Sequence, residues 1–155
     1  MRSTNKTAFL MILGLDIGDS RVGVASCEDS SSIATPLITL ERANGAAEKE
    51  LLRLIAAHSV KILVAGLPLS EDGTRSPQCE SVETFCRRIT KRAEVEVRFV
   101  DEYSSTSEAE ERFRESRIGR SRKKSAQERH KGVIDALAAA IILQSYLDAQ
   151  KRKAT

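Results

Sequence analysis

The first third of the chain contains three blocks of apolar residues that predict β-strands. Residues 9–17 read FLMILGLDI, a continuous apolar run typical of a strand that is buried on both faces. After a Gly-Asp-Ser turn, residues 21–27 (RVGVASC) predict the returning strand of a hairpin. Residues 33–40 predict a weaker third strand, in which Pro36 indicates a sheet edge or a break. The chain is therefore expected to begin with three consecutive strands.

A helix and a buried strand are predicted next. Asn44 is expected to cap a helix that extends to about Ser59, with His58 packed on its apolar face or capping its end. Residues 60–66 (VKILVAG) predict a strand buried within the sheet. Because strand, helix and strand follow one another, we expect a right-handed crossover that joins two parallel strands.

A second helix–strand unit follows the same plan. Ser76 before Pro77 is a typical helix start, with a capping residue followed by proline at the first helical position. Apolar residues at helical spacing give this helix a buried face, formed by Val82, Phe85, Cys86 and Ile89. Residues 95–100 (VEVRFV) alternate at first, as in a half-exposed strand, and are expected to form the last strand.

Two further helices are expected after the last strand. A short charged helix has candidate capping boxes at Ser105 and Ser107, and a final helix extends from about Gln127 or Lys131 to Ala149. Three leading strands followed by helix–strand units predict an α/β fold with a mixed five-stranded sheet flanked by helices, the RNase H-like arrangement. A doubly wound fold would instead alternate strands and helices from the start.

The length of 155 residues fits one domain of ordinary size. We expect an N-terminal extension at residues 1–8, a single RNase H-like domain at residues 9–150 and a basic tail at residues 151–155. Hydrophobic residues make up 41% of the chain and charged residues 30%, which is typical of a globular protein. No apolar run is long enough for a membrane helix and no cleavage site follows the first one, so we expect a cytoplasmic protein that does not bind membranes.

Composition argues against several kinds of site. Aromatic residues total 4% and tryptophan is missing, which disfavours a stacking surface for single-stranded nucleic acid. The three cysteines form no Cys-x-x-Cys pair, so reduced thiols are favoured over disulfides or a zinc site. His58 and His130 are the only histidines, so a Ser-His-Asp triad is poorly supported.

Several acidic residues lie within or at the end of apolar segments, where burial of their charge would cost free energy. Asp16 is the only charge in the first apolar strand, and Asp135 is the only polar residue in the apolar part of the last helix. Asp101 and Glu102 close the last predicted strand. A carboxylate placed against a core must be paired, hydrogen-bonded or bound to metal. Groups of three or four carboxylates without histidine or cysteine suit a hard cation such as Mg²⁺.

Each acid also has a purely structural interpretation. Asp16 and Asp101 can act as hydrogen-bond acceptors at the turns that follow them. Asp135 lies near the predicted start of its helix, where the macrodipole favours an acid, and Lys131 is four residues earlier. Spacing along the chain does not establish that these carboxylates meet in space.

A basic segment precedes the last helix. Residues 117–131 contain seven lysines or arginines, while the net charge of the whole chain is only +3. The segment is interpreted either as a solvated loop or as a contact surface for nucleic-acid phosphates. The candidate nucleic-acid contacts are Arg120, Arg122, Lys123, Lys124, Arg129 and Lys131, together with Arg21 in the first hairpin.

Four segments carry a family resemblance. Residues 14–25 read GLDIGDSRVGVA, and residues 64–68 read VAGLP and are followed closely by Asp-Gly-Thr. Residues 100–110 read VDEYSSTSEAE, and residues 134–147 read IDALAAAIILQSYL. In this order the segments resemble the motifs of the YqgF/RuvX family of Holliday-junction-resolvase-like or pre-16S ribosomal RNA nucleases, and they span nearly the whole chain.

The resemblance implies an RNase H-like fold with a carboxylate cluster. Asp16 on the central strand, Glu102 after the last strand and Asp135 on the final helix would be catalytic and would bind one or two Mg²⁺ or Mn²⁺ ions. Asp101 is the reserve candidate, because successive strand residues face opposite ways and only one of the pair is expected to face inward. The family's third motif usually reads Asp-Glu-Arg, and Tyr103 stands here in place of the arginine. This departure puts efficient catalysis in doubt more than the fold.

The activity implied by the resemblance is that of a metal-dependent endonuclease on structured nucleic acid, which processes the 5′ end of precursor 16S ribosomal RNA. The implied partners are precursor rRNA or the small ribosomal subunit, with the chain a monomer or a weak dimer. A non-catalytic RNA-binding assembly factor and a Holliday junction resolvase acting on DNA are the alternatives. An ATPase of the actin, Hsp70 or sugar-kinase type is disfavoured because it needs two such domains.

Overall fold

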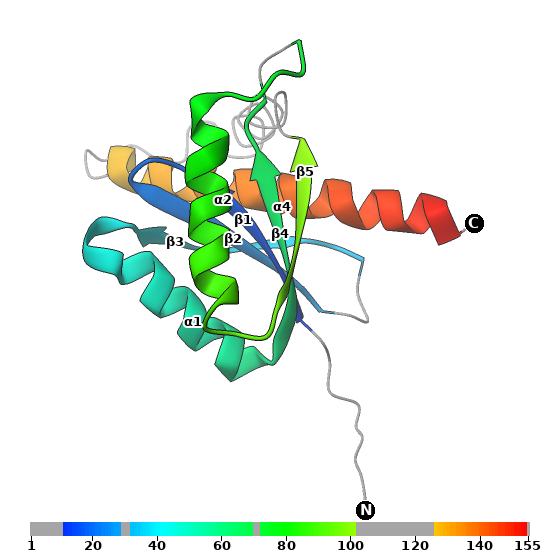
Figure 1. Ribbon diagram of the computed structural model, residues 1–155, viewed down its shortest axis with the longest axis horizontal. Helices are drawn as coiled ribbons and strands as arrows, with labels where there is room; N and C mark the ends of the chain where they lie inside the picture. The colour runs from blue at the N-terminus through cyan, green and yellow to red at the C-terminus, as the bar shows by residue number, and fades with distance from the viewer. Residues whose placement is uncertain (1–10, 29–31, 70–71, 102–125, 155) are drawn as a thin grey trace, which may run out of the picture.

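The computed structural model places five strands in one sheet. It describes residues 11–28, 32–69, 72–101 and 126–154, of which residues 126–131 and 154 are described by their backbone alone. The strands are β1 Met11–Ile17, β2 Arg21–Glu28, β3 Thr35–Glu41, β4 Val60–Leu67 and β5 Glu96–Asp101. They lie in the order β3-β2-β1-β4-β5 (Figure 1).

The strand directions make the sheet mixed. β1 pairs antiparallel with β2, and β2 pairs antiparallel with β3. β1 pairs parallel with β4, and β4 pairs parallel with β5. The predicted hairpin, the parallel crossover and the mixed five-stranded sheet are therefore confirmed. β3 lies at the sheet edge that Pro36 indicated, and the ladder shifts register next to this proline.

Helices cover both faces of the sheet. The helices are α1 Ala46–His58, α2 Pro77–Thr90 and α4 Ala126–Ala154. α1 and α2 lie on one face, while α4 crosses the other (Figure 1). The buried core divides in the same way, into a cluster between the sheet and α1 with α2 and a second cluster between the sheet and α4. The sheet therefore separates two surfaces, called below the α1/α2 face and the α4 face.

Strand alternation assigns the residues of β1 to these faces. Leu13 and Leu15 belong to the core cluster of the α1/α2 face, whereas Ile12 packs against the cluster of the α4 face. Since successive side chains of a strand point to opposite faces, Gly14 and Asp16 lie on the α4 face with Ile12. The one charge of the first apolar strand is thus directed toward the last helix.

Two glycines allow α4 to lie close to the centre of the sheet. A Cβ atom at Gly14 would come within 2.7 Å of the Leu143 Cβ and within 2.8 Å of the Ala139 carbonyl oxygen. A Cβ atom at Gly23 would overlap the carbonyl group of Asp135. Any larger side chain at either position would force the helix away from the strands.

Polar contacts to β3 and the segment before it fix α4 along its length. The Thr39 hydroxyl donates to the Gly132 carbonyl oxygen at 2.5 Å. Further along the helix, the Gln144 side chain accepts from the Ala34 amide and donates to the Ser32 carbonyl, both at 2.9 Å. With these contacts on either side of it, the segment that carries Asp135 has a defined position on the sheet.

Some predicted details are confirmed and others are wrong. Ser76 is the residue before α2 and Pro77 is its first residue, as predicted. Asn44 does not cap α1, because Gly45, with a φ of 72°, occupies the capping position, while Asn44, with a φ of 58°, lies inside the short 3-10 helix Ala43–Gly45. His58 is exposed at the end of α1 and does not pack on the apolar face.

The last helix begins within one residue of Gln127, the earlier of its two predicted starts, and ends at Ala154, beyond the predicted end at Ala149. α4 starts at Ala126, so residues 126–131 of the predicted loop are helical. The stretch Gly132–Lys153 also has a mean hydropathy of 1.4, which by length and composition is enough to cross a membrane, although no such segment was expected. In the structure its apolar side chains Ala139, Ile142 and Leu143 are buried against the sheet, as in the core helix of a globular domain.

Candidate active site

Asp16 and Asp135 approach the same glycine from two different elements. Asp16 in β1 is directly opposite Gly23 in the antiparallel pairing with β2. The backbone of Asp135 in α4 lies against the same Gly23. Because paired residues of neighbouring strands face the same way, Asp16 and Asp135 share the α4 face near the carboxyl end of β1. Two of the predicted residues, one in the sheet and one in the helix, thus lie next to the same position of β2.

Arg21 forms an ion pair with Asp135. Its Nε donates to the Asp135 Oδ2 at 2.6 Å, and the two side chains are 33% and 23% exposed. The hydrogen bond and the negative charge of Asp135 raise the pKa of Arg21 above its usual value. A charge-assisted bond of this length compensates for the partial burial of the carboxylate. Arg21, predicted as a nucleic-acid contact, therefore holds the helix carboxylate in this structure.

The position of Asp135 in α4 excludes stabilisation of its charge by the N-terminus of the helix. The residue lies well inside the helix, because α4 begins at Ala126. The favourable field of a helix N-terminus is confined to about the first turn. The sequence-based alternative that the macrodipole stabilises Asp135 is therefore wrong, and its observed partner is Arg21. The Lys131 side chain is outside the part of the chain whose side chains are described.

Asp101 faces away from Asp16 and Asp135. Val100 packs against the core cluster of the α4 face, and Val97 packs against that of the α1/α2 face. Alternation along β5 then places Asp101 with Val97, on the α1/α2 face, where it is exposed. Asp101, the reserve candidate, is not brought to Asp16 and Asp135. Glu102 lies outside the described residues.

Arg42 holds the turn that follows β1, and sequence reasoning did not identify it. Its Nη1 donates to the Gly18 carbonyl oxygen at 2.7 Å and to the Ser81 hydroxyl of α2 at 3.2 Å. Its guanidinium carbon lies 5.3 Å from the centre of the Phe85 ring, within cation–π distance. The Arg42 amide also donates to the Ser20 carbonyl at 2.9 Å. These bonds fix the turn beside Asp16 to α2 and to the end of β3.

The donor atoms of this site suit a hard divalent cation. Among the residues that the structure describes, no three acidic, histidine or cysteine side chains are grouped as a metal site. Asp16 and Asp135 provide two carboxylates from β1 and α4, and oxygen ligands are those that Mg²⁺ and Mn²⁺ prefer. The chemistry of these two donors fits such an ion, of whose coordination they would supply only a part.

The basic segment is only partly described. Arg120, Arg122, Lys123 and Lys124 lie outside the described residues, as does Tyr103. Arg129 and Lys131 belong to the first turns of α4 by their backbone. Their contacts with phosphates stay a prediction.

Comparisons with known proteins identify similar chains. Residues 10–149 match the model of the RuvX family, described as Holliday junction resolvase. A protein of Gloeothece citriformis named "Putative pre-16S rRNA nuclease" is 39% identical over 144 residues, which cover 90% of this chain and 88% of the relative. A protein of the same name from Syntrophus aciditrophicus is 39% identical over 141 residues, covering 90% of this chain and 89% of the relative.

Solved structures share the fold at low sequence identity. A Fowlpox virus resolvase in complex with Holliday junction DNA has a TM-score of 0.56 at 12% identity, covering 91% of this chain and 99% of that one. RuvC of T. thermophilus with a Holliday junction has a TM-score of 0.51 at 15% identity, covering 92% and 96%. The expected RNase H-like fold is thereby confirmed.

Proposed function

Because this chain belongs to the RuvX family and is a nuclease, we propose that it is a metal-dependent endonuclease whose catalytic residues are Asp16, Glu102 and Asp135. The observation that carries the proposal is the convergence of Asp16 and Asp135 beside Gly23 on the α4 face. Asp101 lies on the opposite face, so Glu102 is the remaining candidate for the third carboxylate. These three side chains would hold one or two Mg²⁺ or Mn²⁺ ions.

The residues of this chain prepare the site for a phosphodiester. When bound, the metal would supply a water of lowered pKa and positive charge that offsets the charge of the transition state. Asp16 is held at the end of a central strand, next to a turn that Arg42 ties to α2. Asp135 is held by the docking of α4, and Arg21 balances its charge. These contacts of Asp16 and Asp135 support the proposal, because side chains held before substrate binds need less reorganisation in the reaction.

The substrate that we propose is the 5′ end of precursor 16S ribosomal RNA, which also implies a cytoplasmic location. The printed names of the relatives from G. citriformis and S. aciditrophicus support this substrate. Arg120, Arg122, Lys123, Lys124, Arg129 and Lys131 are proposed to contact phosphates before and at the start of α4. Contacts of this kind hold structured nucleic acid largely independently of its sequence.

Cleavage of DNA junctions is the second candidate activity. The family description and the fold shared with junction-bound resolvases favour it. An enzyme that cuts two symmetric strands would need a second copy of the chain. A non-catalytic role in ribosome assembly is the third candidate, supported by Tyr103 at the position of the family's arginine.

The test is cleavage of a precursor 16S rRNA fragment beside a four-way DNA junction of similar size. Each substrate is incubated with the full chain in Mg²⁺, in Mn²⁺ and in EDTA. The proposal predicts cutting of the RNA that stops in EDTA. Cutting of the junction alone would assign the second candidate, and binding of RNA without cutting under any metal would assign the third.

A further inference from the structure

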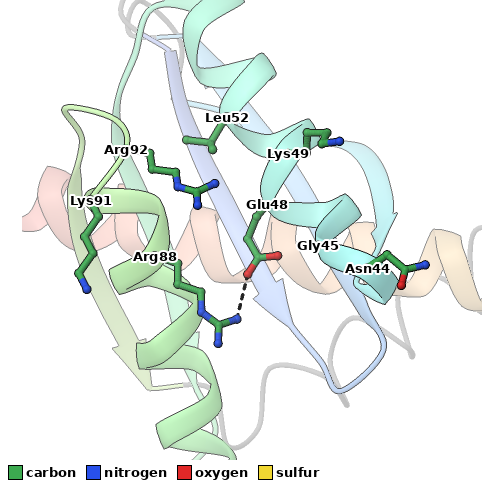
Figure 2. A pocket seen from close by; sticks show the side chains of 8 residues that line it. All are labelled: Asn44, Gly45, Glu48, Lys49, Leu52, Arg88, Lys91 and Arg92. Carbon is green, nitrogen blue, oxygen red and sulfur yellow. Dashed lines mark hydrogen bonds and ion pairs between the residues drawn. The ribbon is translucent and has the colours of Figure 1, made fainter.

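A basic cavity opens on the α1/α2 face, away from the candidate active site. It has a volume of about 660 Å³ and lies between the start of α1 and the end of α2 (Figure 2). Its cationic lining residues are Lys49, Arg88, Lys91 and Arg92. All four side chains are exposed, and the one acid in the lining is Glu48. The cavity therefore carries a net positive charge of three from these five side chains.

Glu48 forms an ion pair with Arg88, which still remains exposed to solvent. Arg88 Nη1 donates to the Glu48 Oε2 at 3.2 Å, and the arginine side chain is 63% exposed while the glutamate is 16% exposed. A guanidinium has five N–H donors, so this bond leaves most of them available to a ligand. Figure 2 shows Arg88 and Arg92 extending from the end of α2 toward the first turns of α1. The acid is thus covered by Arg88, and the accessible surface is cationic.

A second cavity beside the first adds one cation and one acid, and so no net charge. A neighbouring cavity of about 400 Å³ shares Leu52 and Arg92 with the first one. It adds Lys61 at the start of β4, together with Glu94. The two cavities together form a groove whose cations extend from Lys49 to Lys61. An elongated polyanion matches cations spread over both cavities, with their excess in the first one, better than a single compact anion, which would occupy only one cavity.

We propose that this groove binds the phosphate backbone of the RNA substrate, at a second contact separate from the carboxylates of the α4 face. The inference rests on the proposed function in one respect, since it takes RNA as the polyanion that the protein meets. Exposed lysines and arginines on helices are the usual contacts for phosphate oxygens. A contact on the face opposite α4 positions a second part of a structured RNA relative to the cleavage site.

The experiment measures binding of a fluorescently labelled precursor 16S rRNA fragment in EDTA, where metal-dependent cleavage cannot occur. The groove variant is Lys91→Gln with Arg92→Gln, at the end of α2. The matched control is Lys151→Gln with Lys153→Gln, two exposed cations in the last turn of α4. Both variants lose two positive charges at exposed helix ends, so folding is expected to be preserved and is checked by thermal melting.

Near 0.1 M salt, the groove variant is expected to bind the RNA about ten-fold more weakly than the unmodified chain does. The slope of log affinity against log salt should fall by about 1.5, since each lost phosphate contact removes roughly 0.7–0.9. The control should change the affinity less than about two-fold and leave the slope unchanged, because its charges lie away from the groove.

The outcomes separate this inference from the proposed function. If the groove variant and the control have equal RNA affinity and equal salt dependence, the proposal that the groove binds RNA is overturned. The nuclease proposal is then still tested by its own cleavage assay. Loss of binding in the groove variant, in a chain that cuts no RNA in any metal, would support the groove and contradict the nuclease proposal. Failure of the unmodified chain to bind the RNA would overturn the groove, and the nuclease proposal would still be decided by cleavage in Mg²⁺ and Mn²⁺.

Discussion

Arg21 and Asp135 form an ion pair although they are 114 positions apart in the sequence. The arginine opens β2 and the aspartate lies inside α4, so the 2.6 Å bond joins the first hairpin to the last helix. The bond also places a cation on the carboxylate that we propose as a metal ligand. A bound metal ion and Arg21 would therefore either share the Asp135 carboxylate or compete for it.

Replacement of Arg21 tests this relationship. Arg21→Gln should lower the free energy of unfolding by about 1–2 kcal/mol, because it leaves a partly buried carboxylate without its charged partner. The same variant should bind Mn²⁺ several-fold more tightly, because the competing cation is gone. Chemical denaturation and calorimetric titration with Mn²⁺ measure the two effects.

Arg53→Gln is the matched control for Arg21→Gln. Arg53 pairs with Glu50 on the exposed surface of α1, so its loss should change both quantities little. Equal Mn²⁺ affinity in Arg21→Gln and the unmodified chain would show that Arg21 does not compete with metal at Asp135.

Gly23 should be the least replaceable glycine of the described sheet. Gly23→Ala places a methyl group on the Asp135 carbonyl, so α4 must move and the free energy of unfolding should fall by about 3 kcal/mol. Gly73→Ala is the control, because Gly73 has a φ of 85° but nothing within 4 Å of a new Cβ. Its cost should be near 1 kcal/mol, from backbone strain alone. Similar melting temperatures for the two variants would contradict the close approach of α4 to β2.

Arg42 should control the mobility of the turn beside Asp16. Arg42→Gln removes the bond to the Gly18 carbonyl and the contact with the Phe85 ring. Hydrogen exchange at the Gly18 amide, which donates to the Arg21 carbonyl, should become faster by about ten-fold, as expected when roughly 1.4 kcal/mol of local stability is lost. Arg42→Lys should restore part of the protection. Unchanged exchange in Arg42→Gln would mean that the turn is held by other contacts.

Cys86 should make stability depend on alkaline pH. Burial, with a smaller effect of Glu83, raises the pKa of the Cys86 thiol to about 12 from 9.0. Because the folded value is the higher one, this contribution is complete below about pH 9 and is lost as the pH rises toward 12. Urea unfolding at pH 8 and at pH 10.5 should therefore show a larger loss of stability in the unmodified chain than in Cys86→Ala. Equal losses would indicate that the thiol ionises freely in the folded protein.

The strands were predictable because each one leaves a local signal in the sequence. The continuous apolar runs of β1 and β4 and the proline of β3 reflect burial and edge position directly. The α1 start was predicted wrongly because Asn44 resembles a capping residue by type. Its backbone instead takes a left-handed conformation together with Gly45, a conformation that the Asn-Gly pair favours but that the prediction of a cap did not consider.

The candidate site was predictable only in part. Asp16 and Asp135 stand out because each is a lone charge among apolar residues. Alternation could say that Asp101 and Glu102 face opposite ways, but only the packing of Val100 against the α4 face shows which way Asp101 points. The Arg21–Asp135 pair and the bonds of Arg42 to Gly18 depend on how distant segments dock. No periodicity in the sequence carries that information.

The rate of metal-dependent cleavage in paired aspartate variants tests the central claim most directly. Asp16→Asn and Asp135→Asn each remove a carboxylate from the α4 face, and Asp101→Asn makes the same chemical change on the opposite face. The account predicts that the first two variants lose at least about 10³-fold in rate on the precursor RNA, the size of effect seen when a major source of transition-state stabilisation is lost. Asp101→Asn should keep a rate within about two-fold of the unmodified chain. Normal cleavage by Asp16→Asn, or an inactive but folded Asp101→Asn, would contradict the assignment of catalysis to the α4 face.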